Sequence, residues 1–546
     1  MSGDKSEGVV NVDSKPEHLL DKGLETTESE ADRAEVLSAA GISLASDDAD
    51  LPCLTLRMWV IGIGFCLLGS GLNTLYTFRY PSITLSQAAI QFLAFPLGRL
   101  WERVVPDWTI PIFGWKLDLN RGRFNHKENI LIFIMANLSF FTRLSADVLT
   151  EQRVFYGVKC GWGFEIIITL ATILFGFSLA GLCRSIIVEP PAIMWPGVFG
   201  DTALNHALHF TEKERKDSTK WKASRYTFFL IAFSISFCWY WFPDFIFPAM
   251  GYFTFVCWIA PKNAVVNQVF GMKSGIGLLP LTFDWSQIAY ISSPLIAPPW
   301  AIINLLASLV FWIYIISPAL YYTNTWYSAY LPIQSNSVFD NMAETYNVSK
   351  YYSYSPLYMP VTYALNMFGL SFATIPALLI WIGLEKRKEL KAAFKGALNF
   401  KRHLRVEQGS DALVPTWWYL ISCAISVALG MFACEYYPVQ LRWYGALFAF
   451  VISSIMFVPL AMVYATTNLK INIDVFCRIV AGYVFEGKVL ANVWFFDLGY
   501  ISGVKGLQFA QDLKLGLYCN IPARKLFLVQ YTRSVASTFH FSVENC

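Results

Sequence analysis

The chain alternates between long apolar stretches and short polar or charged connections from residue 58 to about residue 501. A helix needs about 20 apolar residues to cross the hydrocarbon core of a bilayer. The stretches that approach this length are 58–78, 83–101, 130–149, 161–183, 226–242, 245–260, 295–320, 360–384, 417–436, 441–464 and, more weakly, 475–502. The pattern predicts an all-α fold, a polytopic bundle of membrane helices.

Two further stretches, 186–210 and 275–294, are apolar but interrupted by proline, glycine or charge. Irregular backbone inside a bilayer is tolerated only where protein buries it or where it lines a wet cavity. We therefore expect both stretches to be broken or re-entrant. Counting them gives about eleven to thirteen spans.

Composition supports the membrane class and sets off the first 50 residues. Apolar residues make up 55% of the chain and charged residues 15%, with a mean hydropathy of +0.44, whereas soluble domains average about 25% charged residues. Residues 1–50 hold 13 acidic against 4 basic side chains and no aromatic residue, which predicts a disordered, acidic, cytoplasmic tail. We expect a membrane domain over 51–530 and an atypical end over 531–546.

Loop charge predicts the orientation, since basic loops stay on the cytoplasmic side. Loop 211–225 has six basic against three acidic residues, and loop 385–408 has eight against three. Loop 321–359 has one lysine and a glycosylation sequon at Asn347, as an outside loop would. A cytoplasmic tail and a cytoplasmic loop 211–225 then require the stretch 186–210 to dip into the membrane and return.

Several classes of chemistry find no support in the sequence. The eleven cysteines form no CxxC pair and histidines number six, so neither a disulfide framework nor a metal site is predicted. A Walker-type glycine loop and a paired catalytic constellation are both absent from the sequence, and we expect neither an enzyme nor a cofactor. Uphill movement would have to draw on an ion gradient.

Longer blocks of sequence point to a family. They include "GSGLNTLYTFRYPSITLSQ" at residue 69, "FDWSQIAYISSPL" at 283, "PALYYTNTWYSAYLPI" at 318, "GYVFEGKVLANVWFFDLGYIS" at 482 and "DLKLGLYCNIPAR" at 512. In these blocks, and in their order from about residue 51 to residue 530, the chain closely resembles the oligopeptide transporter family of fungi and plants.

The two signature motifs of that family are present in altered form. Its NPG motif appears as "NRGRFNHKEN" from residue 120, with Arg121 in place of proline, and its KIPPR motif appears as "NIPAR", with Asn520 and Ala523 substituted. A lost proline frees φ and restores a backbone donor, so we expect less rigid turns. The motif positions that match the family are Asn120, Gly122, Phe124, Asn125, Lys127, Ile521, Pro522 and Arg524.

The resemblance implies a proton-coupled secondary transporter that imports small oligopeptides, such as tetrapeptides, pentapeptides or glutathione-like peptides. Its partners would be the peptide, protons and the lipid bilayer, with no nucleic acid, at the plasma membrane or else an internal membrane. Relatives continue past KIPPR into further helices, whereas this chain stops 22 residues after Arg524, so we expect a C-terminal truncation. The alternatives are a transporter of siderophore-like or nicotianamine-like metal chelates and an inactive, truncated relative.

Three carboxylates are candidates for proton coupling, in the order Asp284, Asp147 and Glu128. An aspartate inside a membrane costs roughly 2.5–3.5 kcal/mol on insertion scales, so Asp284 should face the translocation path. The alternative for Asp284 is a turn near the interface. Asp147 lies four residues after Arg143 and could instead form a structural ion pair. Glu128 could pair with Lys127 in the loop.

Aromatic and amide residues near Asp284 are the substrate-binding candidates. Trp285 and Gln287 could stack on and hydrogen-bond a peptide, or else serve as an interface anchor and an interhelical hydrogen bond. The second group, Tyr321, Tyr322, Asn324 and Trp326, lies at the end of a predicted span. Aromatic belts at membrane interfaces have the same composition without binding any ligand.

Overall fold

The computed structural model describes residues 51–77, 87–112, 115–140, 144–190, 193–209, 225–289, 296–346, 356–384 and 414–544, together with Arg387 and Lys391. The predicted tail 1–50, loop 211–224, nearly all of loop 385–408, Arg143 and Asn347 lie outside the described residues.

The predicted class is confirmed, since the described residues form a polytopic helical bundle. Seven helical stretches in the described ranges are long and apolar enough to cross a bilayer: Leu56–Asn73, His126–Val154, Trp162–Leu182, Pro299–Tyr322, Val361–Leu384, Thr416–Tyr436 and Trp443–Thr467. A shorter apolar helix covers Thr227–Trp241. The protein is therefore a multi-pass integral membrane protein.

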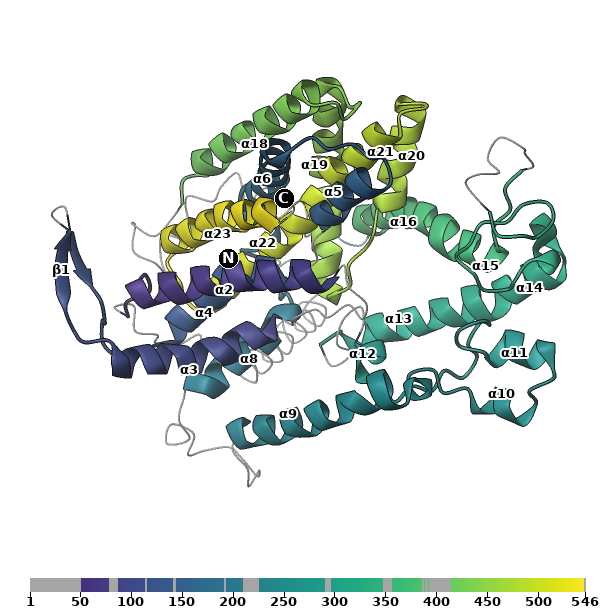
Figure 1. Cartoon of the computed structure of the whole chain (residues 1–546), viewed down its shortest axis with the longest axis horizontal. Helices are drawn as coiled ribbons and strands as arrows, with labels where there is room; N and C mark the ends of the chain where they lie inside the picture. The colour runs from purple at the N-terminus through teal and green to yellow at the C-terminus, as the bar shows by residue number, and fades with distance from the viewer. Residues whose placement is uncertain are drawn as a thin grey trace, which may run out of the picture.

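A central bundle of seven helices holds the core (Figure 1). Its members are α2 (Leu56–Thr77), α4 (His126–Phe140), α6 (Trp162–Leu182), α18 (Thr416–Tyr436), α19 (Trp443–Thr467), α22 (Ser502–Tyr518) and α23 (Ala523–Glu544). Helix α4 is buried on all sides from Lys127 to Ser139. It packs against α2, α22 and α23, so polar groups on α4 lie inside protein and not against lipid.

Two glycines let α6 and α22 approach closely. A Cβ added at Gly176 of α6 would lie 2.6 Å from the Ser502 carbonyl oxygen and 2.7 Å from the Gly506 nitrogen. Small residues at such a crossing allow backbones to pack without side chains between them. The crossing fixes the position of α22 against α6, and with it the position of the polar side chains of α22 inside the bundle.

Short elements complete the bundle. Helix α3 (Ala88–Val104) leads through a two-stranded antiparallel hairpin, β1 (Thr109–Ile112) and β2 (Trp115–Asp118), into α4. Further along the chain come α5 (Leu144–Val154), α7 (Arg184–Ile187), α8 (Gly197–His209), α20 (Asp474–Val484), α21 (Val489–Phe496) and the π-helix η8 (Asp497–Ile501). The interruption predicted within 186–210 is the turn between α7 and α8.

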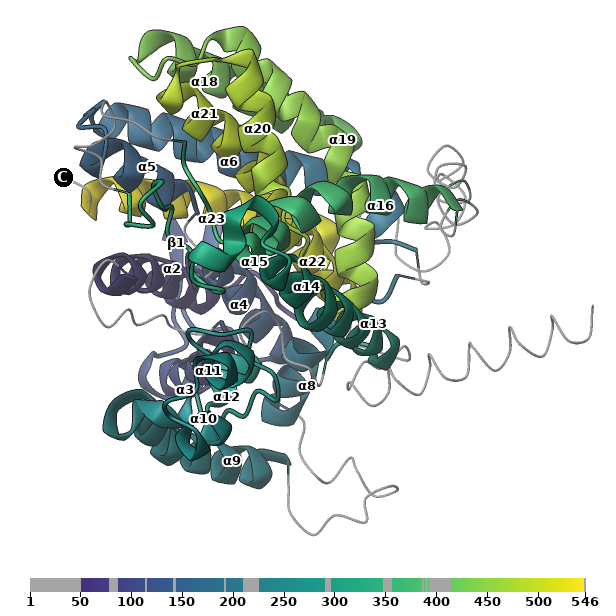
Figure 2. The same ribbon diagram turned by 90° about the vertical axis from the view of Figure 1, so that its right-hand side faces the viewer.

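The described residues between 225 and 384 form an arm that lies to one side of the bundle in Figure 1 and in front of it in Figure 2. Its α-helices are α9 (Arg225–Trp241), α10 (Phe255–Ile259), α11 (Ala264–Phe270), α12 (Trp285–Ile288), α13 (Pro299–Leu309), α14 (Ser317–Tyr322), α15 (Val361–Tyr363) and α16 (Leu370–Leu384). Between them lie the π-helices η2 (Phe242–Ile246), η4 (Val310–Ile316) and η7 (Ala364–Gly369), and the 3₁₀-helices η3 (Pro248–Met250) and η5 (Thr325–Tyr330).

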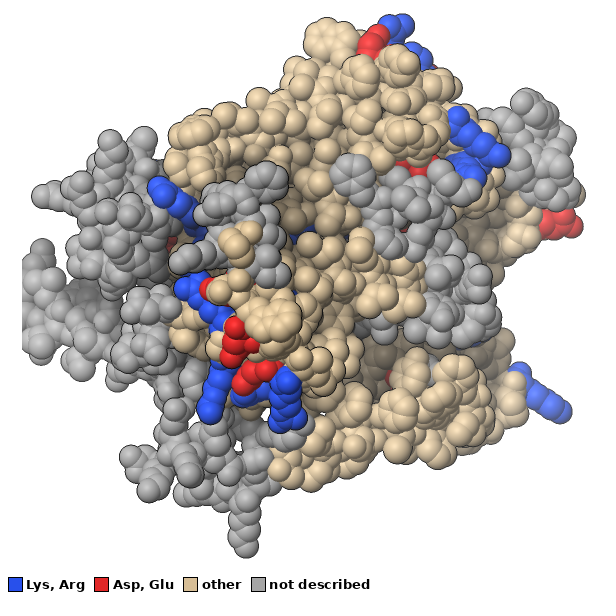
Figure 3. Space-filling view, turned by 60° about the vertical axis from the view of Figure 1, so that its left-hand side comes forward, with Lys and Arg blue, Asp and Glu red and all other residues tan. Residues whose placement is uncertain are grey.

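The surface fits a hydrocarbon environment. The arm exposes large apolar side chains such as Phe233, Ile235 and Leu306, which lipid tails would cover. On the face drawn in Figure 3, uncharged residues cover most of the described surface, and Lys, Arg, Asp and Glu gather in a few small groups.

Candidate functional site

An ion pair lies at the centre of the bundle, between α22 and α23. The Arg533 Nη1 atom donates to Asp512 Oδ2 over 2.6 Å, and both side chains are almost fully buried. The same Nη1 atom also donates to the carbonyl oxygen of Ile134 on α4. Two consecutive helices, α22 and α23, therefore meet α4, which is distant in sequence, at one pair of charges.

Asn137 of α4 joins this ion pair to further amides. Its Nδ2 donates to Asp512 Oδ1 over 2.7 Å. Its Oδ1 accepts from Gln508 Nε2 over 2.6 Å and from Gln87 Nε2 over 3.3 Å. We call Asn137, Gln508, Asp512 and Arg533 the central polar cluster. Its amides bond to each other and to the carboxylate, as buried polar groups must.

Part of the Arg533 guanidinium is unused. Its carbon atom lies 4.4 Å from the centroid of the Phe509 ring. Among the described residues, its Nε and Nη2 atoms have no hydrogen-bond partner. A buried guanidinium with unused donors can bind a carboxylate or water, because its planar fork of N–H groups donates to oxygen atoms.

A second buried carboxylate, Asp497, begins the π-helix η8. Thr172 of α6 donates to its Oδ2 over 2.9 Å. Its Oδ1 atom has no hydrogen-bond partner within the described ranges. π-helical turns occur often at functional sites.

The altered NPG loop caps the start of α4. The Asn125 side chain accepts from the Glu128 backbone N–H over 2.9 Å, and Glu128 Oε2 accepts from the Asn125 N–H over 3.3 Å. This reciprocal pair is a capping box with asparagine in the first position. Asn120 donates to the carbonyl oxygens of Glu102 and Val105 at the end of α3. Gly122 has a positive φ of 70°, which glycine adopts without strain.

Two other positions of this loop that match the family motif, Phe124 and Lys127, are buried inside the protein. Phe124 is buried beneath Arg57, whose guanidinium lies 5.5 Å from the ring centroid. Lys127 is buried in the first turn of α4.

The altered KIPPR segment forms the turn between α22 and α23. Asn520 has a positive φ of 49°, a conformation that asparagine adopts more readily than lysine. The buried Ile521 donates its backbone N–H to the Gly516 carbonyl oxygen, and the Pro522 carbonyl oxygen accepts from the N–H groups of Lys525 and Leu526. Arg524 is exposed at the start of α23.

Asp284 lies at the start of the short helix α12, in the arm. Its Oδ1 accepts from the backbone N–H of Ser286 over 2.9 Å and from the Ser286 hydroxyl over 2.5 Å, which is the geometry of an N-cap. Asp284 is 5% exposed, whereas Trp285 is 55% exposed and Gln287 is also exposed. The role predicted for these three residues stays a prediction.

Two members of the aromatic group at the end of α14, Tyr321 and Tyr322, are hydrogen-bonded to the same glutamine. Gln268 of α11 donates to the buried Tyr321 hydroxyl over 3.2 Å and accepts from the Tyr322 hydroxyl over 3.3 Å. Asn324 accepts from the Ala329 N–H over 3.1 Å, and Trp326 is exposed. This aromatic group therefore lies at the surface of the arm.

The structure keeps the three carboxylates predicted for coupling on separate elements. Asp284 is in the arm and Glu128 is at the start of α4, where it pairs with Arg57. Asp147 is exposed on α5 and interacts electrostatically with Lys505 of α22. The residues of the central polar cluster are not among the site residues predicted from the sequence.

A signal for that cluster was nonetheless present. Lys505, Gln508 and Asp512 are spaced at i, i+3 and i+7, so they lie on one helical face. The charged residues Lys505, Asp512 and Lys514 interrupt the apolar pattern of this segment, so the pattern does not predict a buried helix there.

A charged contact ties the turn after α7 to α22. Arg184 Nε lies 3.5 Å from Glu189 Oε1, and Lys514 Nζ donates to the Val188 carbonyl oxygen over 2.8 Å. Burial raises the pKa of Glu189 to about 7, against the opposing effect of Arg184 and Lys514. Glu189 therefore titrates near neutral pH.

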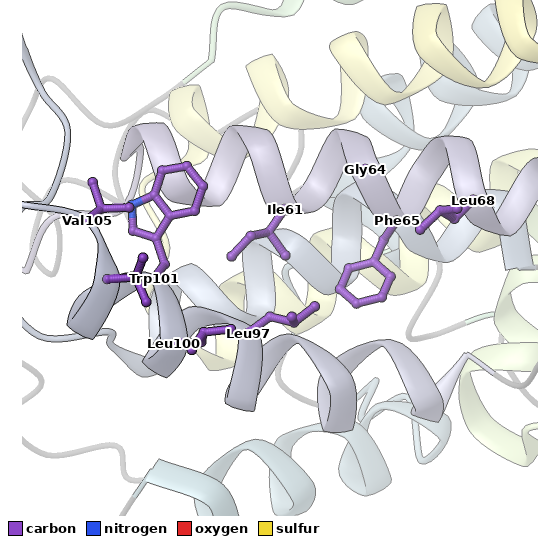
Figure 4. Close-up of a pocket in the computed structure, with 9 residues that line it drawn as sticks. Ile61, Gly64, Phe65, Leu68, Leu97, Leu100, Trp101 and Val105 are labelled. Atoms are coloured by element: carbon purple, nitrogen blue, oxygen red, sulfur yellow. The ribbon is translucent and has the colours of Figure 1, made fainter.

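An apolar groove between α2 and α3 is not a peptide site. Its volume is about 320 Å³, and Figure 4 shows side chains such as Ile61, Phe65, Leu97 and Leu100 along it. A peptide needs hydrogen-bond partners that this lining lacks.

Comparison with known proteins matches residues 53–540 to the family described as OPT oligopeptide transporter protein. The sexual differentiation process protein isp4 of Schizosaccharomyces pombe is 37% identical over 507 residues, which cover 90% of this chain and 64% of that protein. Glutathione transporter 1 of the same organism is 36% identical, with 89% of this chain and 59% of that protein covered. Oligopeptide transporter 1 of Saccharomyces cerevisiae is 31% identical, with coverage of 95% and 67%. The chain spans about three fifths of the length of the first two relatives.

Proposed function

This chain belongs to the oligopeptide transporter family, and from that membership and its interior geometry we propose that it imports small peptides together with protons. Two relatives are named for the transport of oligopeptides or glutathione, so a short peptide is the substrate that fits. The plasma membrane is the site at which import from outside would serve the cell.

The observation that carries the proposal is the Asp512–Arg533 ion pair, held by Asn137 inside the bundle. Charged groups within a membrane are costly, and they mark pathways and proton relays. Arg533 of α23 acts electrostatically on Asp512, and Asp512 in turn acts on Asp201 of α8 and on Tyr464 of α19. Several elements therefore respond to the charge of one carboxylate.

The same geometry supplies a mechanism. A proton on Asp512 removes the partner charge of Arg533, whose guanidinium then attracts the carboxylate of an incoming peptide. When the peptide leaves, Asp512 releases its proton on the cytoplasmic side of the membrane and forms the ion pair with Arg533 again. Moving one charge through 100 mV supplies about 2.3 kcal/mol, which can drive peptide accumulation.

The test is uptake of a labelled tetrapeptide as a function of external pH. The parent protein should take up more peptide at acidic pH and lose this dependence with a protonophore. The double variant Asp512→Asn/Arg533→Gln keeps the charge balance and should reach the membrane, but its uptake should no longer respond to pH. The single variant Asp512→Glu keeps a titratable carboxyl group, so its uptake should keep part of the response to pH.

Two results would contradict the proposal. One is unchanged pH dependence in the double variant. The other is parent protein that takes up an iron chelate and no peptide.

A further inference from the structure

Several carboxamide side chains lie where α3, α4 and α8 meet, and two pairs of them are hydrogen-bonded, Gln87 to Asn137 and Asn129 to Asn205. We propose that this carboxamide seam, made of Gln87, Gln91, Asn129, Asn137 and Asn205, binds the peptide bonds of the substrate, with Gln91 as its open position. The inference rests on the proposed function. It adds which part of the substrate the protein recognises, namely the peptide backbone.

Gln91 is the residue that requires an explanation. Its side chain is fully buried, yet neither its Oε1 nor its Nε2 atom has a hydrogen-bond partner among the described residues. Burying an amide without partners is unfavourable, and such groups in native proteins mark a bound water, ion or ligand. Gln91 therefore offers one donor and one acceptor to a molecule that enters.

The position of Gln91 follows from its neighbours on α3. Gln87, one turn earlier, donates to Asn137 of α4 over 3.3 Å. Gly98, about two turns later, lies against the Phe124 ring just before α4. Gln91 shares the buried face of α3 with Ala94 and Gly98. It therefore lies on the face of α3 that is turned toward α4, and Gln91 is not among the residues that line the apolar groove between α2 and α3.

The far end of the seam has a second unused acceptor. Asn129 of α4 donates to Asn205 Oδ1 of α8 over 3.2 Å, and Asn205 donates to the His126 carbonyl oxygen over 3.3 Å. The Asn129 Oδ1 atom has no partner within the described ranges. Figure 1 shows α3, α4 and α8 lying together, which agrees with the contacts between them.

The chemistry of the seam selects its ligand. A carboxamide pairs with a peptide bond through one N–H and one C=O on each side, whatever the neighbouring side chains are. A short peptide laid along the seam would place its backbone at Gln91 and its terminal carboxylate at the unused donors of Arg533. The seam thus predicts recognition of the backbone, with wide tolerance for side chains.

The experiment compares tetra-alanine with the same peptide methylated at one internal peptide nitrogen. Each position of the methyl group is tested in the full-length parent and in Gln91→Leu, with Gln334→Leu as a matched control on an exposed glutamine. For one methyl position, the parent should lose about tenfold in apparent affinity, the effect of one lost hydrogen bond. Gln91→Leu should bind the plain peptide about tenfold more weakly and show no further loss on methylation.

The control and the folding measurement keep the outcomes distinct. Gln334→Leu should behave as the parent, and the melting midpoint of Gln91→Leu in detergent should stay equal or rise, since an unpaired amide is removed. If Gln91→Leu keeps the parent affinity, or keeps the full methylation penalty, the inference is wrong while the proposed function stands. If Gln91→Leu does not fold, the same comparison in Gln91→Met decides. A parent that neither binds nor takes up any peptide overturns the proposed function and the inference together.

Discussion

Arg57 of α2 and Glu128 of α4 form an ion pair with no exposed side-chain surface, the Nη2 and Oε2 atoms lying 2.7 Å apart. Arg57 also donates to the carbonyl oxygens of Gly122 and Arg123. One arginine thus holds the altered NPG loop and the start of α4 against α2. The geometry accounts for Glu128 as a structural partner.

Glu128→Gln should therefore destabilise the protein strongly. Removing one member of a buried ion pair costs about 3–5 kcal/mol, because the other charge stays buried without its partner. We expect a large fall in the melting midpoint, measured in detergent. Asn125→Ala should cost less, because it removes a cap worth about 1 kcal/mol and one hydrogen bond, from Asn125 Nδ2 to the Pro52 carbonyl oxygen, but leaves no buried charge unpaired. A Glu128→Gln protein as stable as the parent, but without pH-driven uptake, would instead support the sequence-based coupling role.

Gly176→Ala should disrupt the crossing of α6 and α22. The new Cβ would meet backbone atoms 2.6–2.7 Å away, and backbone cannot rotate aside as a side chain can. Overpacking of this kind costs about 1–3 kcal/mol, and it should also shift Gln508 and Asp512, lowering uptake. Gly64→Ala in α2 is the matched control, because nothing lies within 4 Å of the added carbon. Equal melting midpoints for the two variants would argue against the close crossing.

Asp284→Asn should retain acid-stimulated uptake if Asp512 carries the proton. Asparagine caps a helix about as well as aspartate, so the turn before α12 keeps its hydrogen bonds. The sequence-based hypothesis predicts the opposite, a normal level in the membrane with severely reduced pH-driven uptake. Uptake of labelled peptide at two external pH values distinguishes the two carboxylates.

Glu189 predicts a pH dependence of stability. Burial raises its pKa to about 7 in the folded protein, above the ordinary value of 4.5. The stability it contributes is fully present below pH 4.5 and is lost as the pH rises through 7. The melting midpoint of the parent should thus fall between pH 5 and pH 8, and Glu189→Gln should reduce that fall. An unchanged slope in the variant would assign the dependence to other groups.

Hydrophobic pattern predicted the class of fold because lipid imposes one rule on every spanning helix. Stretch 161–183 appears as α6 and stretch 417–436 as α18, within one or two residues. Stretch 475–502 instead divides into α20, α21 and η8, since the polar turn Glu486–Lys488 contains Gly487 with a positive φ of 73°. The hydrophobic pattern alone does not predict whether a short polar turn ends a helix within an apolar stretch.

The central polar cluster was harder to predict, for a physical reason. Asp512 and Arg533 are 21 residues apart and Asn137 lies 375 residues before Asp512, so only packing brings them together. Hydropathy treats their charges as signs of exposure, whereas each is buried by its partners. Asp284 stood out because its surroundings in the sequence are apolar, but surroundings in the sequence are not surroundings in space.

Asn137 has a further consequence, for the polarity of its own amide. Its NH₂ group now points at the Asp512 carboxylate, and its oxygen receives N–H groups from Gln508 and Gln87. A proton on Asp512 Oδ1 would set two donors face to face, and a half-turn of the Asn137 amide relieves this. Gln508 and Gln87 must then turn as well, since each would meet an NH₂ group where it had an oxygen. Arrival of one proton would thus reverse a whole line of dipoles, a change that amide vibrational spectra could follow without any displacement of a helix.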